Sequence, residues 1–171
     1  METTLRAQKK NPVWLENLLK WTRALRPESF GATVVPVTLG SLLALGGVDV
    51  EWGLVPFILL SALALHAGTN LVNDYYDYDL GVDNEFSLGG SGMLVSGELT
   101  AKQIARAAIV AFGLAAYLGV PLIILRGWPI VMLGLVGIAG GALYTAKPVQ
   151  YKYWGAGDIL VFILMGPLMV G

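Results

Sequence analysis

Residues 104–125 read IARAAIVAFGLAAYLGVPLIIL, and from Ala107 to Leu125 this stretch carries no charged side chain. At about 1.5 Å per residue, a helix of this length crosses the roughly 30 Å hydrocarbon core of a bilayer. Its apolar residues do not alternate with polar ones, as they do in membrane β-barrels. Because only helices and closed barrels satisfy their backbone in lipid, the stretch predicts a transmembrane helix.

The whole chain has the composition of a membrane protein. Its 171 residues are 56% hydrophobic and 13% charged, with a mean hydropathy of +0.66, whereas soluble domains carry about 25% charged residues. The apolar content excludes a disordered chain, and the absence of cysteine excludes a disulfide-stapled scaffold. A net charge of −1 without a basic stripe excludes nucleic acid as a partner. We expect an all-α integral membrane protein, a multi-spanning helical bundle embedded in the lipid bilayer.

The apolar runs predict four full transmembrane helices and a shorter fifth. Before them, residues 1–28 mix Lys and Arg with Trp and Leu, which predicts a cytoplasmic, interfacial amphipathic segment; residues 29–171 form the membrane domain. The fifth run reaches the last residue and covers only about 20 Å, so we expect a truncated helix. The expected spans are 30–47, 52–67 continuing into the polar sequence 70–83, 104–125, 128–146 and 159–171.

The positions of Lys and Arg predict the orientation. With the N-terminus in the cytoplasm, ten of the 11 basic residues lie on the cytoplasmic side, in residues 1–28 and in the loops after the second and fourth spans. The positive-inside rule therefore predicts a multi-pass protein of the cell inner (cytoplasmic) membrane with a cytoplasmic N-terminus.

Acidic side chains gather where the second span reaches the cytoplasm, since five of the 12 lie between Asp74 and Glu85. A helix turns by about 100° per residue, so several polar side chains fall on one face of this span. Asp79 falls on the opposite face, and Gly81 predicts the end of the helix. The residues on the shared face are His66, Asn70, Asn73, Asp74 and Asp77.

This polar face has the composition of a magnesium site. Two carboxylates one turn apart repel each other and are costly near lipid unless a positive charge lies between them. Asp and Asn oxygens suit Mg²⁺, which commonly bridges carboxylates to substrate phosphates. The sequence therefore predicts a diphosphate anchor with Asn73, Asp74 and Asp77 as metal ligands. The alternative is a solvated helix end, and for His66 a packed or hydrogen-bonded role is favoured over metal ligation.

The sequence Asn73-Asp74-x-x-Asp77, with Gly81 and then Asp83, resembles the first aspartate-rich motif of the UbiA superfamily of membrane prenyltransferases. This variant is similar to the branch that prenylates 1,4-dihydroxy-2-naphthoate in menaquinone biosynthesis. Further segments resemble that branch in register, namely 25–30, 35–41, 89–100 and 144–166.

The resemblance implies a Mg²⁺-dependent transferase with a polyprenyl diphosphate and an aromatic acceptor as substrates. It implies catalytic roles for Asp74, Asp77 and Asp83. The expected substrate-binding residues are Asn70, Asn73, Arg26, Tyr144, Lys147 and Lys152; the three basic ones are equally readable as charges that set the orientation.

The family has nine helices and a second aspartate-rich motif. The resemblance therefore predicts that this chain is an N-terminal part, inactive alone, which a missing C-terminal half completes; a homo-oligomer is also possible.

Two other functions stay open. Lys147 and Pro148 depart from the naphthoate and hydroxybenzoate patterns respectively, so another acceptor such as 4-hydroxybenzoate is an alternative. A non-enzymatic, cation-binding transporter or assembly subunit is the second. A conduction path needs ionisable groups near the bilayer midplane, whereas these acids gather at one end of a span, which favours the enzyme.

Overall fold

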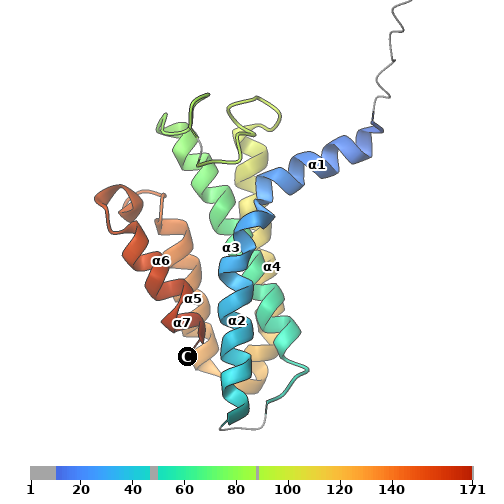
Figure 1. Cartoon of the computed structure of the whole chain (residues 1–171), viewed down its shortest axis with the longest axis vertical. Coiled ribbons are helices and arrows are strands. Elements are labelled where there is room, and N and C mark those ends of the chain that lie inside the picture. The colour runs from blue at the N-terminus through green and yellow to red at the C-terminus, as the bar shows by residue number, and fades with distance from the viewer. Residues whose placement is uncertain (1–10, 47–49, 88, 171) are drawn as a thin grey trace, which may run out of the picture.

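The computed structural model describes residues 11–46, 50–87 and 89–170, and every regular element in these ranges is helical. The helices are α1 (Val13–Leu25), α2 (Gly31–Leu43), α3 (Val55–Asp79), α4 (Ala101–Arg126), α5 (Trp128–Leu143), α6 (Gly157–Met165) and α7 (Pro167–Val170), with short 3-10 turns η1 (Pro27–Phe30), η2 (Ala44–Gly46) and η3 (Tyr151–Trp154). Most of these helices run along the long axis of the molecule, while α1 diverges from one end (Figure 1). The predicted all-α class is confirmed for the described residues.

Three helical stretches are long and apolar enough to cross a membrane: Pro27–Gly46, Val55–Asp79 and Ala101–Arg126. The prediction of a fourth full span over residues 128–146 is wrong in its length. Helix α5 has 16 residues, or about 24 Å, which is less than a hydrocarbon core of roughly 30 Å. It ends at Leu143, three residues before the predicted end.

The fifth predicted span is divided rather than continuous. Helix α6 ends at Met165, and α7 begins at Pro167, on the far side of Gly166. Gly166 has φ −101° and ψ −101°, outside the helical region. The last residue of that predicted span, Gly171, lies outside the described residues.

Helices α3 and α4 form the centre of the bundle. Leu71 on α3 and Ile104 on α4 are fully buried in one hydrophobic cluster. The Ser61 hydroxyl donates to the Ala115 carbonyl across the pair at 2.8 Å. In lipid the hydrophobic effect does not drive helices together, because the lipid tails are as apolar as the side chains. Helix association there depends on tight packing of this kind.

Helix α5 packs against α3 at two of its glycines. A Cβ placed on Gly137 would lie 2.9 Å from the Leu65 side chain, and one on Gly141 would lie 2.2 Å from the Thr69 hydroxyl. Small residues permit this close approach between membrane helices. The approach brings the chain that follows α5 back to the polar end of α3.

The polar end of α3 stops at a Schellman motif. Gly81 takes the left-handed conformation, with φ 69°, and the Val82 amide donates to the Asp77 carbonyl at 2.8 Å. Helix α4 then begins with a capping box formed by Thr100 and Gln103. The loop between α3 and α4 lies at the same end of the bundle as α1 (Figure 1).

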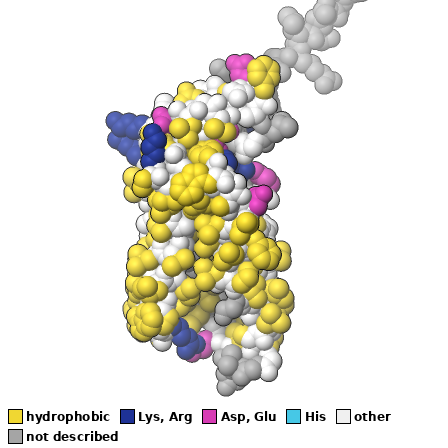
Figure 2. All heavy atoms as spheres, turned by 90° about the vertical axis from the view of Figure 1, so that its left-hand side faces the viewer, with side chains coloured by type: hydrophobic (Ala, Val, Ile, Leu, Met, Phe, Trp, Pro, Cys, Tyr) yellow, Lys and Arg dark blue, Asp and Glu magenta, His cyan; other side chains and the backbone are white. Residues whose placement is uncertain are grey.

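The outer surface carries the hydrophobic side chains expected of a bundle in lipid. Figure 2 shows them over the middle of one face, with charged groups gathered towards the ends. At the end opposite the polar loop, Arg126 pairs with Glu51 at 2.9 Å. On α1, Trp14 and Leu18 are exposed. The interfacial placement of 1–28 stays a prediction, and residues 1–10 of that segment lie outside the described residues.

Candidate active site

One face of α3 carries a buried row of polar side chains. Asp74 and Asp77 are each only 2% exposed, although they lie in the last two turns of the helix. Asp79 is exposed, as the helical projection predicts. A solvated helix end is therefore excluded for the first two acids. The other buried members of this row are His66, Asn70 and Asn73.

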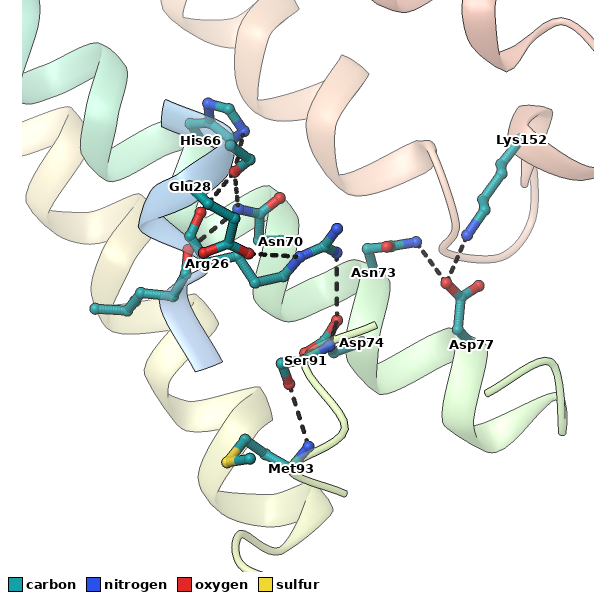
Figure 3. A network of polar contacts seen from close by, with 12 residues as sticks. Arg26, Glu28, His66, Asn70, Asn73, Asp74, Asp77, Ser91, Met93 and Lys152 are labelled. Carbon is teal, nitrogen blue, oxygen red and sulfur yellow. Dashed lines mark hydrogen bonds and ion pairs between the residues drawn. The ribbon is translucent and has the colours of Figure 1, made fainter. Parts of the chain in front are cut away.

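Asp74 is held by two segments that are distant in sequence. Arg26 Nη1 lies 3.6 Å from Asp74 Oδ1, and the Ser91 amide donates to both carboxylate oxygens at 3.3 Å. Arg26 sits between α1 and η1 with left-handed backbone angles, φ 56° and ψ 57°. This turn directs its guanidinium toward α3 (Figure 3).

Asp77 is held by the connection between α5 and α6. Lys152 Nζ lies 2.5 Å from Asp77 Oδ2, and the Tyr153 hydroxyl donates to Oδ1. The Asn73 amide nitrogen donates to Oδ2 at 2.8 Å, one turn back on the same helix. Figure 3 shows Lys152 and Arg26 reaching α3 from different segments.

The two buried carboxylates are thus neutralised separately. A buried carboxylate without a partner would carry a large desolvation cost, and a cation close by offsets much of it. Arg26 is the cation that pairs with Asp74, and Lys152 is the cation that pairs with Asp77. The end of α3 therefore combines two acids and two bases in a small, largely buried volume.

Asn70 belongs to a second polar cluster farther from the loop. Its amide nitrogen donates to the Leu25 carbonyl at 3.1 Å and to the Ser29 hydroxyl at 3.0 Å. His66 contacts the hydroxyls of Ser29 and Thr33. The preference for a hydrogen-bonded His66 is confirmed.

Asp83 follows the end of α3 and lines a surface hollow of about 320 Å³ together with residues of the loop. Its carboxylate lies against Gly90, where an added Cβ would be 2.1 Å from Oδ2. Burial, and then the negative charge of Asp77, raise the pKa of the Asp83 carboxyl above its ordinary value of 3.8. Asp83 is thus near the acid pair but outside its ion pairs.

The predicted residues after α5 divide into two groups. Lys152 reaches the acids, and its ammonium group also lies 5.9 Å from the centre of the Tyr144 ring. Tyr144 packs edge-on against Tyr151, with ring centres 5.3 Å apart. Lys147 is exposed, and no ion pair links it to the described part of the chain. The structure therefore brings Lys152 and Tyr144 to the site but not Lys147.

Two contacts at the site are absent from the sequence prediction. The Tyr153 hydroxyl reaches Asp77, and its pKa is raised by burial and by this hydrogen bond to a carboxylate. The Ser91 amide reaches Asp74. The only feature of the sequence that could have indicated Tyr153 is its position next to Lys152. No feature of the sequence indicates that the Ser91 backbone amide contacts Asp74.

The donors at the end of α3 fit Mg²⁺ in type and number. Within the described ranges, no group of three or more His, Cys, Asp or Glu side chains forms a complete metal site. Two carboxylates and the neighbouring Asn73 amide are present instead. Mg²⁺ commonly takes only one or two protein carboxylates and completes its shell with water and substrate phosphates. A metal held by this set would take most of its ligands from water and from a substrate diphosphate.

The structure thus combines three apolar helical stretches long enough to cross a membrane with a buried cluster of two acids and two bases. The UbiA prenyltransferase family matches residues 33–171, and the chain belongs to this family. The match covers most of the chain, including every helix from α3 to α7.

Individual relatives agree with that assignment. The chain is 37% identical to 1,4-dihydroxy-2-naphthoate octaprenyltransferase of Bacillus subtilis over 145 residues, 85% of this chain and 47% of that protein. It is 30% identical to the Mycobacterium tuberculosis protein of the same name over 156 residues, 91% of this chain and 53% of that protein. It is 34% identical to human UbiA prenyltransferase domain-containing protein 1 over 161 residues, which cover 92% of this chain and 47% of that protein. The chain thus spans about half the length of the curated relatives it matches.

Proposed function

We propose that the intact protein containing this chain transfers a polyprenyl group from an allylic polyprenyl diphosphate to an aromatic acceptor. The observation that carries the proposal is the pair Asp74 and Asp77, both buried at one end of a spanning helix and each matched with a cation from another segment. Membership in a prenyltransferase family supports the same reaction.

The proposed acceptor is 1,4-dihydroxy-2-naphthoate. Two relatives, from Bacillus subtilis and Mycobacterium tuberculosis, carry the name of an octaprenyltransferase for this compound. The variant motif ending in Gly81 and Asp83 supports the same branch. The corresponding proposed role is in menaquinone biosynthesis. The positive-inside rule supports a protein of the cytoplasmic membrane with its N-terminus in the cytoplasm.

Charge neutralisation of the leaving group is the main task of the site. An allylic diphosphate gains negative charge on its leaving oxygens as the carbon–oxygen bond breaks. Arg26 and Lys152 now contact Asp74 and Asp77, and they bind the diphosphate oxygens when substrate enters between the two pairs. Asn73, Asp74 and Asp77 hold Mg²⁺, which supplies Lewis-acid stabilisation of the departing diphosphate.

The surroundings of the acids protect the reaction from water. The allylic carbon that loses diphosphate is electrophilic, and an electron-rich ring carbon of the acceptor must reach it before water does. Tyr144 and Tyr153 lie beside Lys152 and present aromatic rings near the diphosphate end. Such rings stabilise a desolvated cation by about 1–2 kcal/mol. Asp83 completes the acidic set at the mouth of the site.

Isosteric variants of the acids test the proposal. Asp74→Asn and Asp77→Asn in the intact protein are expected to lower prenyl transfer by about 100-fold or more, because each removes a charge needed at the leaving group. Asp79→Asn is the matched control, since Asp79 belongs to the same helix but is exposed on the other side. Full activity in both site variants would contradict the proposal.

The acceptor is tested separately with a fixed polyprenyl diphosphate. We expect transfer to 1,4-dihydroxy-2-naphthoate to exceed transfer to 4-hydroxybenzoate in kcat/KM by at least about 100-fold. The reverse order would retain the prenyltransferase and overturn its proposed acceptor.

A further inference from the structure

We propose that His66 is a positioning residue: through Ser29 it fixes the turn that presents Arg26 to the diphosphate site. This inference rests on the proposed function, in which Arg26 binds the diphosphate. It assigns a task to a buried polar cluster that lies one to two turns away from the acids.

His66 contacts two residues of η1 and one in the first turn of α2. Its Nε2 lies 3.2 Å from the Ser29 hydroxyl and its Nδ1 lies 2.7 Å from the Thr33 hydroxyl. Its ring also packs against Phe30, with ring centres 5.4 Å apart. His66 is 6% exposed and Thr33 is fully buried. The imidazole therefore joins α3 to η1 and to the first turn of α2, with both ring nitrogens engaged.

The donors and acceptors in this cluster fit a single arrangement. Ser29 has one hydroxyl proton, which it donates to the Arg26 carbonyl at 2.8 Å. Its oxygen must then accept from the Asn70 amide at 3.0 Å and from His66 Nε2–H. The other ring nitrogen, Nδ1, accepts from the Thr33 hydroxyl. A neutral His66 with its proton on Nε2 satisfies every member of the cluster.

The cluster holds the peptide groups on both sides of the Arg26 Cα. Asn70 donates to the Leu25 carbonyl at 3.1 Å, and Ser29 donates to the Arg26 carbonyl. Arg26 adopts a left-handed conformation, which costs a residue with a side chain about 1–2 kcal/mol. The surrounding contacts maintain this conformation. From it the guanidinium reaches to 3.6 Å from Asp74.

Substrate affinity and turnover respond differently to a positioning role and to a packing role. His66 is too far along α3 to act on the substrate through a direct contact with Asp77, three turns away. Loss of positioning therefore weakens diphosphate binding through Arg26. Loss of packing alone lowers the stability and the amount of active protein, without a selective change in KM.

The test uses His66→Leu and His66→Gln in the intact protein. His66→Leu is expected to raise KM for polyprenyl diphosphate, and the Kd of a non-reactive thio-analogue, by about 5–20-fold with kcat within about 2-fold. His66→Gln retains an N–H donor for Ser29, so it is expected to recover most of the affinity. Ser29→Ala removes the hydroxyl that links His66 to the Arg26 carbonyl. It is expected to raise KM and Kd as much as His66→Leu does.

Ser61→Ala is the control, because it removes a partly buried hydrogen bond between α3 and α4 away from this cluster. It is expected to leave KM unchanged. Unchanged KM and Kd in His66→Leu and Ser29→Ala would overturn the inference, as would His66→Gln being no better than His66→Leu.

A double-mutant cycle identifies Arg26 as the group through which His66 acts. In an Arg26→Gly background, His66→Leu is expected to cause no further loss of affinity. An equal loss in both backgrounds would overturn the inference while leaving the proposed function intact. Failure of the unaltered protein to bind the thio-analogue at all would instead contradict the proposed function.

Discussion

Lys152 Nζ lies 2.5 Å from Asp77 Oδ2, although the two residues are 75 positions apart in the sequence. The contact ties the connection after α5 to the end of α3. On the same helix, one turn earlier, Asp74 pairs with Arg26 from the chain before α2. Two distant segments therefore converge on one turn of α3, each contributing one cation to one buried acid.

Removal of the Lys152 charge should destabilise the protein. Lys152→Met leaves the buried Asp77 carboxylate without its cation. A fully buried pair loses about 3–5 kcal/mol in this way; since the Lys152 side chain is 28% exposed, we expect about 1–3 kcal/mol. Thermal and denaturant unfolding in detergent measures the change. Lys147→Met is the control and should alter stability by less than about 0.5 kcal/mol.

Addition of Asp77→Asn should recover part of the stability lost in Lys152→Met, because it removes the unbalanced charge. Equal stability of Lys152→Met and Lys147→Met would show that the contact between Lys152 and Asp77 does not stabilise the protein.

Arg26 should tolerate glycine better than alanine. Both substitutions delete the guanidinium that faces Asp74, but only glycine adopts the left-handed turn without steric cost. We expect Arg26→Gly to be about 1 kcal/mol more stable than Arg26→Ala, with prenyl diphosphate binding weakened equally in both. Unfolding and binding measurements on the two variants suffice. Alanine at least as stable as glycine would show that the turn is not retained.

Gly90→Ala should displace the Asp83 carboxylate. The new Cβ would lie 2.1 Å from Oδ2 and 2.8 Å from Cγ, so the Asp83 side chain must rotate away. Because those atoms are the end of a side chain that is not fully buried, the stability cost should stay under about 1 kcal/mol. Prenyl transfer should fall more than in Gly89→Ala, where a Cβ meets nothing within 4 Å. Equal activities would separate Asp83 from the reaction.

The titration of Asp83 should give the stability a defined pH dependence. Its pKa is raised in the folded state, first by burial and then by the charge of Asp77. The folded state therefore holds the proton at pH values above 3.8 at which the unfolded chain has released it. The free energy of unfolding should decline as pH rises from 3.8 through the raised pKa. Asp83→Asn should lack this part of the decline, and a wild-type slope in the variant would contradict the assignment.

The helices and the acid face are predictable from sequence because both depend on local periodicity. The apolar run of 104–125 matches α4, and Gly81 marks the end of α3 because it alone provides the left-handed turn without strain. The projection of α3 placed Asp74 and Asp77 together, and the structure buries both.

The partners of these acids are less predictable. Lys152 and Arg26 were recognisable as candidates by charge, yet nothing in the sequence indicates which acid each one meets. The Lys152 pairing depends on how α5 packs against α3 through Gly137 and Gly141. The Arg26 pairing depends on how the turn before η1 contacts α3, where Asn70 donates to the Leu25 carbonyl. Hydropathy overestimates the length of α5 by three residues, because it does not locate the last residue of a helix, which here is Leu143.

Calorimetric titration of the intact protein with a polyprenyl thiodiphosphate shows whether the buried acids of α3 bind a metal together with a diphosphate. With Mg²⁺ present, we expect saturable binding that EDTA abolishes and that Asp74→Asn and Asp77→Asn each weaken by at least about 10-fold, with Asp79→Asn unchanged. Binding that is equally strong in EDTA and in both site variants would contradict metal-dependent diphosphate binding by these acids.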